Sequence, residues 1–192
     1  MSEDEVEAIA EKGFEADRND DLPGAMKWLK EAADLGHAKA QSMLAYKLDK
    51  ADFDEWAFEL YKASAEQGYA EAMYGLAGMY RMGEGTTWDE GLALQWYMKA
   101  AEANYHKAQF QIGYIYEFGN LGLDIDYEKA LEWYKRPAEE GFRRAILRMI
   151  LVYENGELGQ AIDLVKVEYW RQKKADQESK LRQINESKKD LQ

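Results

Sequence analysis

The sequence predicts an all-α fold in which helix pairs stack on one another in repeated units. Two observations indicate this. Four segments align with one another at a regular interval, and within each segment small and apolar residues recur at helical spacings. No stretch alternates apolar and polar residues with the period of two that a half-buried strand requires. We therefore expect about five antiparallel helix pairs and no sheet.

The repeat is visible in four aligned segments, GAMKWLKEAADLGHAKA, WAFELYKASAEQGYAEA, LALQWYMKAAEANYHKA and KALEWYKRPAEEGFRRA, which begin at Gly24, Trp56, Leu92 and Lys129. One large apolar position recurs at intervals of 32, 36, 37 and 37 residues, at Trp28, Leu60, Trp96, Trp133 and Trp170. Eight residues after each of the first four comes a glycine or asparagine, and four further on an alanine. A register this persistent indicates tandem structural units.

The first helix of each unit centres on a small residue, at Ala45, Ala77 and Gly113. Apolar residues five and one before it and three after it fall on one stripe of the helix, which is its core-facing side. The stripe around Ala77, for example, contains Ala72, Leu76 and Tyr80.

The second helix of each unit is expected to begin near an aspartate that caps its N-terminus, at Asp21, Asp54, Asp89, Asp126 and Asp163. It should end at a residue that readily enters the left-handed conformation, namely Gly36, Gly68, Asn104 or Gly141. The recurring tryptophans follow the apolar period, so they are interpreted as core residues that fill the space between helix pairs.

The composition narrows the classes of function. The chain has 37 acidic and 25 basic side chains, and its net charge of −12 argues against nonspecific nucleic-acid binding and against docking on an anionic membrane, since both need a basic surface. It has no cysteine, which excludes disulfides and thiolate sites, and its two histidines leave little for zinc or for histidine-driven catalysis. We therefore expect no cofactor, no metal and no catalytic residue.

One carboxylate cluster could suggest calcium. Asp124, Asp126 and Glu128 alternate along the chain, but the glycine and the distal glutamate of a calcium loop are absent at the required offsets. Asp126 is better interpreted as the cap of the helix that follows it.

The N-terminus and the apolar runs bear on location. The opening MSEDEVEAIAEK is acidic where a secretory signal would be basic, which predicts a cytoplasmic protein. The most apolar run, residues 145–153, is interrupted by Arg148 and is far shorter than the roughly 18 residues of a membrane span. It is therefore interpreted as part of the core.

The repeat resembles the Sel1-like repeat family, whose units are somewhat longer relatives of the tetratricopeptide repeat. The matching positions are the small residues, the aromatic residues and the glycine turns of two successive units: Ala72, Leu76, Ala77, Tyr80, Gly83, Glu84, Gly85, Asp89, Ala93, Trp96, Ala100, Ala101 and Glu102, then Ala108, Ile112, Gly113, Tyr116, Gly119, Asp126, Tyr127, Glu128, Lys129, Ala130, Trp133, Ala138, Glu139, Glu140 and Gly141. The resemblance covers nearly everything from Ala8 to about Ala175. It implies a right-handed α-solenoid, whose members usually act as non-catalytic adaptors.

The resemblance divides the chain into a Sel1-like repeat domain at residues 1–175 and a charged C-terminal helix extension or tail at residues 176–192. The tail has few apolar residues, so its end is expected to fray or to be ordered by a partner. In the fourth unit Pro137 takes a small-residue site, where its missing amide donor should kink or loosen the helix. The fifth unit has Ile150 and Val167 in place of small residues and is interpreted as a terminal cap.

The predicted binding site is the face of each first helix opposite its core stripe, because by analogy with the tetratricopeptide fold this side lines a concave groove. Aromatic side chains there would supply large contact areas at a low cost in conformational entropy. The residues predicted to bind a partner on this face are Tyr46, Tyr74, Arg81, Lys107, Phe110, Tyr114, Glu117 and Arg144, and Leu147 and Leu151 fall in the same rows.

The charges on this face have two interpretations. Their signs alternate from one unit to the next, in the row Lys39, Glu71, Lys107 and in the row Asp49, Arg81, Glu117. Neighbouring repeats could therefore pair across the stack, which would make these charges structural. Alternatively, the same side chains could contact a ligand.

The sequence thus predicts a non-enzymatic protein–protein interaction adaptor that binds a partner polypeptide, an extended peptide or a helix, in the groove of a helical-repeat solenoid. The partner is expected to be a protein or peptide and not nucleic acid or membrane, and the chain is expected to be a monomer. Two alternatives stay open, a small hydrolase that uses groove carboxylates and a structural subunit that oligomerises through the C-terminal helix.

Overall fold

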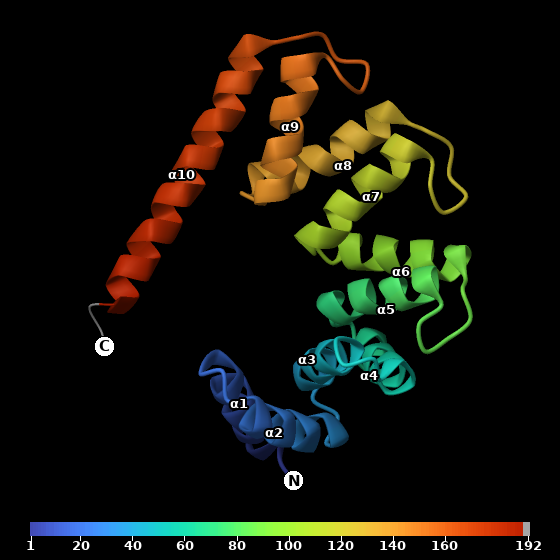
Figure 1. Cartoon of the computed structure of the whole chain (residues 1–192), viewed down its shortest axis with the longest axis vertical. Helices are drawn as coiled ribbons and strands as arrows, with labels where there is room; N and C mark the ends of the chain where they lie inside the picture. The colour runs from blue at the N-terminus through green and yellow to red at the C-terminus, as the bar shows by residue number, and fades with distance from the viewer. Residues whose placement is uncertain (190–192) are drawn as a thin grey trace. The chain divides into compact units, whose positions relative to one another are not determined.

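The computed structural model describes residues 1–189, and over that range it contains helices, turns and no strand (Figure 1). The chain divides into two compact units, unit 1 at Met1–Tyr105 and unit 2 at His106–Gln192. The all-α fold of helix pairs predicted from the sequence is confirmed in each unit. None of the helices within residues 1–189 combines the length and the apolarity needed to cross a bilayer.

Within each unit, every helix packs on the next one along the chain, so the helices form consecutive antiparallel pairs. Unit 1 contains α1 (Glu3–Arg18), α2 (Leu22–Asp34), α3 (Ala38–Asp49), α4 (Asp54–Glu66), α5 (Ala70–Met82) and α6 (Glu90–Glu102). The described part of unit 2 contains α7 (His106–Phe118), α8 (Tyr127–Glu139), α9 (Arg143–Asn155) and α10 (Leu164–Lys189).

Aspartates cap four of the five second helices, as the sequence predicts. An Oδ1 atom accepts a hydrogen bond from a backbone N–H of the first turn at Asp21, Asp89, Asp126 and Asp163, over 2.8–3.1 Å. The prediction is wrong for Asp54, which is the first residue of α4. The short turn before it places Asp52 in the left-handed conformation and leaves Phe53 at the cap without a side-chain acceptor.

The predicted helix ends are confirmed. Gly36, Gly68, Asn104 and Gly141 follow the second helices with φ between 63° and 91°, a left-handed conformation that is inexpensive for glycine and accessible to asparagine. These turns reverse the chain within two or three residues, which keeps the next helix antiparallel and in contact.

Small residues let the helices approach closely in both cores. Ala40, Ala45, Ala72 and Ala77 are fully buried in unit 1, and a Cβ atom on Gly13 would lie only 3.0 Å from the side chain of Leu29. The core of unit 2 is made of alanines together with larger side chains from α8, α9 and α10, among them Tyr134, Ile146, Met149, Val152, Val167 and Trp170. Each unit therefore buries an apolar stripe that a single helix pair could not bury alone.

The interpretation of the tryptophans as core residues is confirmed only for Trp170, which is 3% exposed. Trp28, Trp96 and Trp133 are half-buried, and lysine ammonium groups lie over two of their rings, such as Lys99 Nζ at 3.9 Å from the Trp96 ring centroid. The residue after each of the first four recurring positions is buried instead: Leu29, Tyr61, Tyr97 and Tyr134 are at most 5% exposed. Adjacent helical positions differ by about 100° in direction, so only one of the two can face the core.

Two further expectations concern Pro137 in α8 and the boundary of the C-terminal extension. α8 continues through the buried Pro137 to Glu139, so the proline does not end the helix. The predicted division between residues 175 and 176 falls within α10 and stays a prediction, and residues 190–192 lie outside the described range. α10 is fixed to the rest of unit 2 by contacts as far as Glu178, whose carboxylate pairs with Arg143 at 3.5 Å.

Candidate functional site

Five tyrosines of unit 1 come from α3 to α6 and from the turn after α6, and we call them the tyrosine face: Tyr46, Tyr61, Tyr74, Tyr97 and Tyr105. Tyr46 is 56% exposed. Tyr74 is half-buried, and its ring centroid lies 5.3 Å from that of Tyr97 and 5.5 Å from that of Tyr105. These two ring contacts fix the orientation of Tyr74.

Two tyrosines of the second helices lie opposite glycines of α5, and one of these glycines is needed to make room for the ring. A Cβ atom on Gly75 would lie 2.5 Å from Cε1 of Tyr61, so the tyrosine ring rests directly on the backbone of α5. At Gly78 a Cβ atom would lie 3.9 Å from the hydroxyl of Tyr97. Gly75 thus helps to shape the tyrosine face, whereas the contact at Gly78 would also admit an alanine.

The tyrosine face has a marked electrostatic environment. Burial raises the pKa of Tyr61, and the carboxylates of Asp49 and Glu71 raise it further. Burial and Glu71 likewise raise the pKa of Tyr105, whose hydroxyl donates to Glu71 Oε1 over 3.2 Å. Burial raises the pKa of Tyr97 to about 12, although the positive charge of the Arg81 guanidinium opposes the increase. These phenols are therefore protonated donors at neutral pH.

In unit 2 the corresponding position holds a closed ionic network, which we call the Glu117 network. The Tyr134 hydroxyl donates to Glu117 Oε2 over 2.7 Å, and Arg148 donates to both oxygens of Glu117 over 2.6 and 3.1 Å. A second carboxylate, Glu157, accepts from the other end of the same guanidinium. Burial opposes the charge of Arg148, but the two carboxylates outweigh it and raise the pKa of the guanidinium.

The structure places the predicted residues of unit 1 as follows. Tyr46, Tyr74 and Arg81 all lie at the tyrosine face, Tyr46 and Arg81 exposed and Tyr74 half-buried. Arg81 meets Tyr97, and Tyr74 packs on Tyr97 and Tyr105. Arg81 and Tyr74 are therefore linked through Tyr97, a tyrosine that the sequence prediction did not include.

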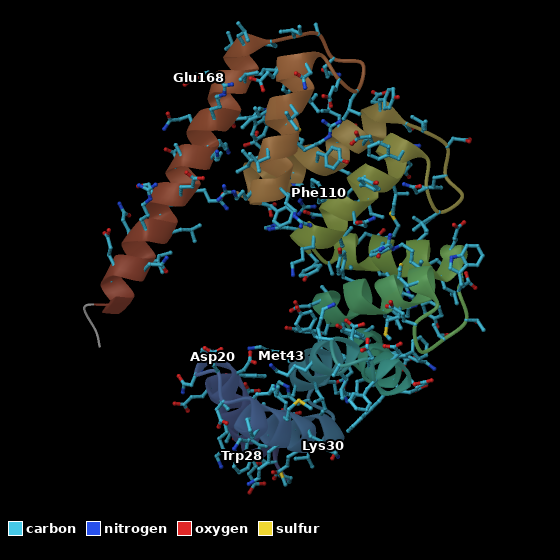
Figure 2. The ribbon with its side chains drawn as sticks, viewed as in Figure 1. Asp20, Trp28, Lys30, Met43, Phe110 and Glu168 are labelled. Carbon is cyan, nitrogen blue, oxygen red and sulfur yellow. The ribbon has the colours of Figure 1, made fainter. Side chains whose placement is uncertain are left out.

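The predicted residues of unit 2 fall into two classes. Lys107, Tyr114 and Arg144 are exposed, and Leu147 and Leu151 in the same rows are 37% and 45% exposed. Phe110 packs inside the unit, with its ring centroid 5.0 Å from Tyr134 and 6.0 Å from Phe142 (Figure 2). Glu117 has a side chain that is only 10% exposed, because the Glu117 network encloses it.

Three of the charged residues in the two rows contact groups that lie outside the rows. Lys39 Nζ lies 3.9 Å from the ring centroid of Phe14, Glu71 accepts from Tyr105, and Glu117 binds Arg148. Each of these charges is held within its own unit by an aromatic ring, a phenol or an arginine that the two rows do not contain.

The prediction from sequence missed Tyr61, Tyr97, Tyr134 and Arg148. The first three had a signal, since a tyrosine follows the recurring large position in three units. Arg148 had none, because it interrupts an apolar run and its partner Glu117 is 31 residues away.

Both histidines have structural roles. His37 caps α3, with Nδ1 accepting from the Ala40 N–H over 3.1 Å and Nε2 bonded to Glu7 over 2.9 Å. His106 pairs with Glu140 in unit 2. Among residues 1–189 no group of three or more histidine, aspartate or glutamate side chains is arranged to hold a metal ion.

The repeat pattern matches a known family along most of the chain. The family model described as the Sel1 repeat matches residues 9–37, 38–69, 70–105 and 106–142. The chain belongs to the Sel1 repeat family. In this Sel1 repeat protein the first match begins inside α1, and the other three begin at the first residues of α3, α5 and α7. Every match ends in the turn after the second helix that follows.

Solved structures support the same assignment. A Sel1 repeat protein from Oxalobacter formigenes is 26% identical with a TM-score of 0.79, and the match covers 89% of this chain and 73% of that one. A protective antigen of uropathogenic Escherichia coli strains that displays an SLR fold is 28% identical with a TM-score of 0.71, over 90% of this chain and 38% of that one. The fold class is therefore that of the Sel1 solenoids.

One curated relative also matches. The chitin synthase regulator SKT5 of Saccharomyces cerevisiae is 34% identical over an alignment of 111 residues, and the match covers 54% of this chain. The match covers 16% of that protein, so this chain corresponds to a small part of its length.

Proposed function

We propose that this Sel1 repeat protein is a non-enzymatic interaction module that binds a partner polypeptide in a concave groove lined by the faces of its first helices opposite their core stripes. The observation that carries the proposal is the tyrosine face, which combines the exposed ring of Tyr46 with the half-buried Tyr74, whose ring packs on those of Tyr97 and Tyr105. Rigid aromatic groups bind with little loss of conformational entropy and are enriched among residues that dominate interface energies. The family to which the chain belongs generally mediates protein–protein interactions, which supports the proposal.

The proposed contact residues are Tyr46, Tyr74 and Arg81 in unit 1 and Lys107, Phe110, Tyr114 and Arg144 in unit 2. In this proposal Glu117 acts indirectly, since its carboxylate holds Arg148 within the unit. Phe110 would offer a partner only the edge that its contacts with Tyr134 and Phe142 leave open.

A phage-display selection tests this function: the full chain is the immobilised target, and peptides that bind it are selected from a random library. Tyr46→Ala should weaken binding of the selected peptides by about tenfold or more, as expected for an aromatic residue at the centre of an interface. Trp88→Ala is the matched control, because Trp88 is 61% exposed in the turn between α5 and α6. Equal binding by the two variants would contradict the assignment of the face.

Several parts of the proposal rest on the sequence alone. They are the role as an adaptor that joins two partners, the cytoplasmic location and the monomeric state. The relative SKT5 is named a regulator of another protein, and an adaptor role fits such a regulator. Light scattering of the purified chain tests the monomeric state directly.

A second candidate is a structural subunit that oligomerises through α10. It is favoured by Leu181 and Ile184, which are 52% and 51% exposed beyond the last contacts of α10 with unit 2. A chain shortened after Lys180 keeps those contacts and loses the two apolar side chains. If light scattering gives the same mass for both chains, this candidate is rejected.

A further inference from the structure

The fourth residue after the small position of each first helix is a charged residue: Asp49 in α3, Arg81 in α5, Glu117 in α7 and Glu154 in α9. The side chains at this position lie toward the C-terminus of the helix. A carboxylate there is opposed by the negative end of the helix dipole, so it needs compensation from another group.

Both carboxylates of this kind in unit 2 bind a guanidinium group. Glu117 binds Arg148 of the next first helix over 2.6 and 3.1 Å. Glu154 binds Arg171 of its own second helix over 2.6 Å. Carboxylate–guanidinium pairs are charge-assisted and geometrically specific, so they compensate the helix end well.

Unit 1 lacks both arginines at the equivalent positions. The position of Arg148, two residues before the small position, is Gly75 in α5, and the position of Arg171 in the second helix is Tyr61 in α4. Asp49 has an ion pair with its neighbour Lys50 over 3.5 Å, but the lysine side chain is 66% exposed. Such a solvated pair contributes little.

The side chains around Asp49 form a suitable receptor for a guanidinium. The Tyr61 side chain is 5% exposed, and its hydroxyl forms no hydrogen bond with any part of the chain that the structure describes. The carboxylates of Asp49 and Glu71 both act electrostatically on this hydroxyl. The exposed ring of Tyr46 flanks the same site, since the Lys50 ammonium that pairs with Asp49 lies 5.7 Å from the Tyr46 ring centroid, and this ring offers an aromatic face to a cation. Two carboxylates, a phenol oxygen and an aromatic ring match the planar, multiply donating shape of arginine better than the compact ammonium of lysine.

We propose that unit 1 binds an arginine side chain of the partner polypeptide beside Asp49, Glu71 and Tyr46, where it takes the part that Arg148 takes in unit 2. The inference rests on the proposed function and names the chemical group that the partner presents. The internal pair Glu117–Arg148 is the template, since it joins the same repeat positions within one chain.

The test is an NMR titration of the full chain, with labelled tyrosine rings, against an acetylated and amidated Gly-Arg-Gly peptide. A single side chain should bind weakly, with a dissociation constant on the order of 1 mM, and should shift the ring signals of Tyr46 and Tyr61 in a saturable manner. The same peptide with citrulline in place of arginine keeps the planar shape and loses the charge, and it should cause no saturable shift. A lysine peptide should bind several-fold more weakly.

The variant Asp49→Asn/Glu71→Gln should lose binding of the arginine peptide while its helical content and melting temperature stay near those of the parent. The control Glu66→Gln removes one charge from an exposed position at the end of α4 and should bind as the parent does. Binding of the citrulline peptide at the same concentration, an unaffected double variant, or no shift with the arginine peptide would each overturn the proposal.

The peptides selected by display separate this inference from the proposed function. Selected peptides that bind the tyrosine face without arginine would leave the function standing and overturn the inference. If a selected peptide contains arginine at a fixed position, replacing it with citrulline should weaken binding at least tenfold on the parent chain and little on Asp49→Asn/Glu71→Gln.

Discussion

Arg148→Met should destabilise unit 2 strongly. The substitution keeps most of the apolar stem of the side chain and removes the guanidinium that binds Glu117 and Glu157. The side chain of Arg148 is 14% exposed and that of Glu117 is 10% exposed, so both charges are largely removed from water. Glu117 would then be a nearly buried carboxylate without its counter-ion.

The magnitude follows from the groups that stay behind. Breaking a buried ion pair by removal of one partner costs about 3–5 kcal/mol. Glu117 would keep the hydrogen bond from Tyr134, and Glu157 is 37% exposed and can turn to solvent. We therefore expect a loss near the lower limit, about 3 kcal/mol of unfolding free energy.

Urea unfolding followed by circular dichroism measures the loss of unfolding free energy. The two compact units need not unfold together, so hydrogen exchange of the α7 and α9 amides reports on unit 2 separately. Glu117→Gln in the Arg148→Met background should recover part of the stability, because it removes the unpaired charge. Arg136→Met is the control, since Arg136 is 56% exposed in its pair with Glu140 and should change stability little. A loss below about 1 kcal/mol for Arg148→Met, or strict additivity with Glu117→Gln, would refute the reasoning.

Three other predictions concern the helices and tyrosines. Gly113→Ala should lower the melting temperature and reduce the unfolding free energy by about 1–3 kcal/mol, because its Cβ atom would lie 2.7 Å from a tyrosine ring. Gly78→Ala is the control: its nearest neighbour would lie at 3.9 Å, so it should leave the melting temperature unchanged or raise it. Raising the pH should destabilise unit 1 through Tyr97, because its pKa is about 12 in the folded chain and 10.0 as the ordinary value. The contribution of Tyr97 to the unfolding free energy is complete below pH 10 and falls by about 3 kcal/mol as the pH rises toward 12. Urea unfolding of Tyr97→Phe should show a smaller decrease over the same pH range. Asp89→Ala should remove the cap of α6 and cost about 1 kcal/mol in thermal unfolding, and Asp89→Asn should restore most of it.

The features that the sequence predicted well are local or periodic. The helix pairs, four of the aspartate caps and the left-handed turns follow from residue types at fixed spacings, and each depends on a few neighbouring residues. The prediction that Asp54 caps α4 failed because one residue more or less in a short turn decides which side chain lies at the N-cap position. Such boundaries depend on the backbone of the turn, and composition alone does not determine it.

The assignment of aromatic residues failed for a different reason. Trp96 and Tyr97 both recur with the repeat and are both aromatic, so the period does not say which of them faces the core. The structure buries the tyrosine and leaves the tryptophan partly exposed beneath Lys99. Packing against the neighbouring helix makes this choice, as it does for Tyr61 on Gly75. The same holds for the Glu117 network, whose members are brought together only by the stacking of α7, α8 and α9.

Repetition allows one position to be compared across several settings within a single chain. At the fourth residue after the small position, Glu117 and Glu154 are each satisfied by an arginine of their own unit, and Arg81 meets a tyrosine hydroxyl. Asp49 occupies the same position without such a partner, and the residue that decides this is a glycine at Gly75 where unit 2 has Arg148. Because stability in a repeat array is shared between neighbouring units, one unit can leave a carboxylate available to a partner without losing its fold. Gly75 stands where unit 2 has Arg148, and its missing side chain also lets the Tyr61 ring rest on α5. This one position therefore leaves Asp49 without an internal arginine and shapes the tyrosine face.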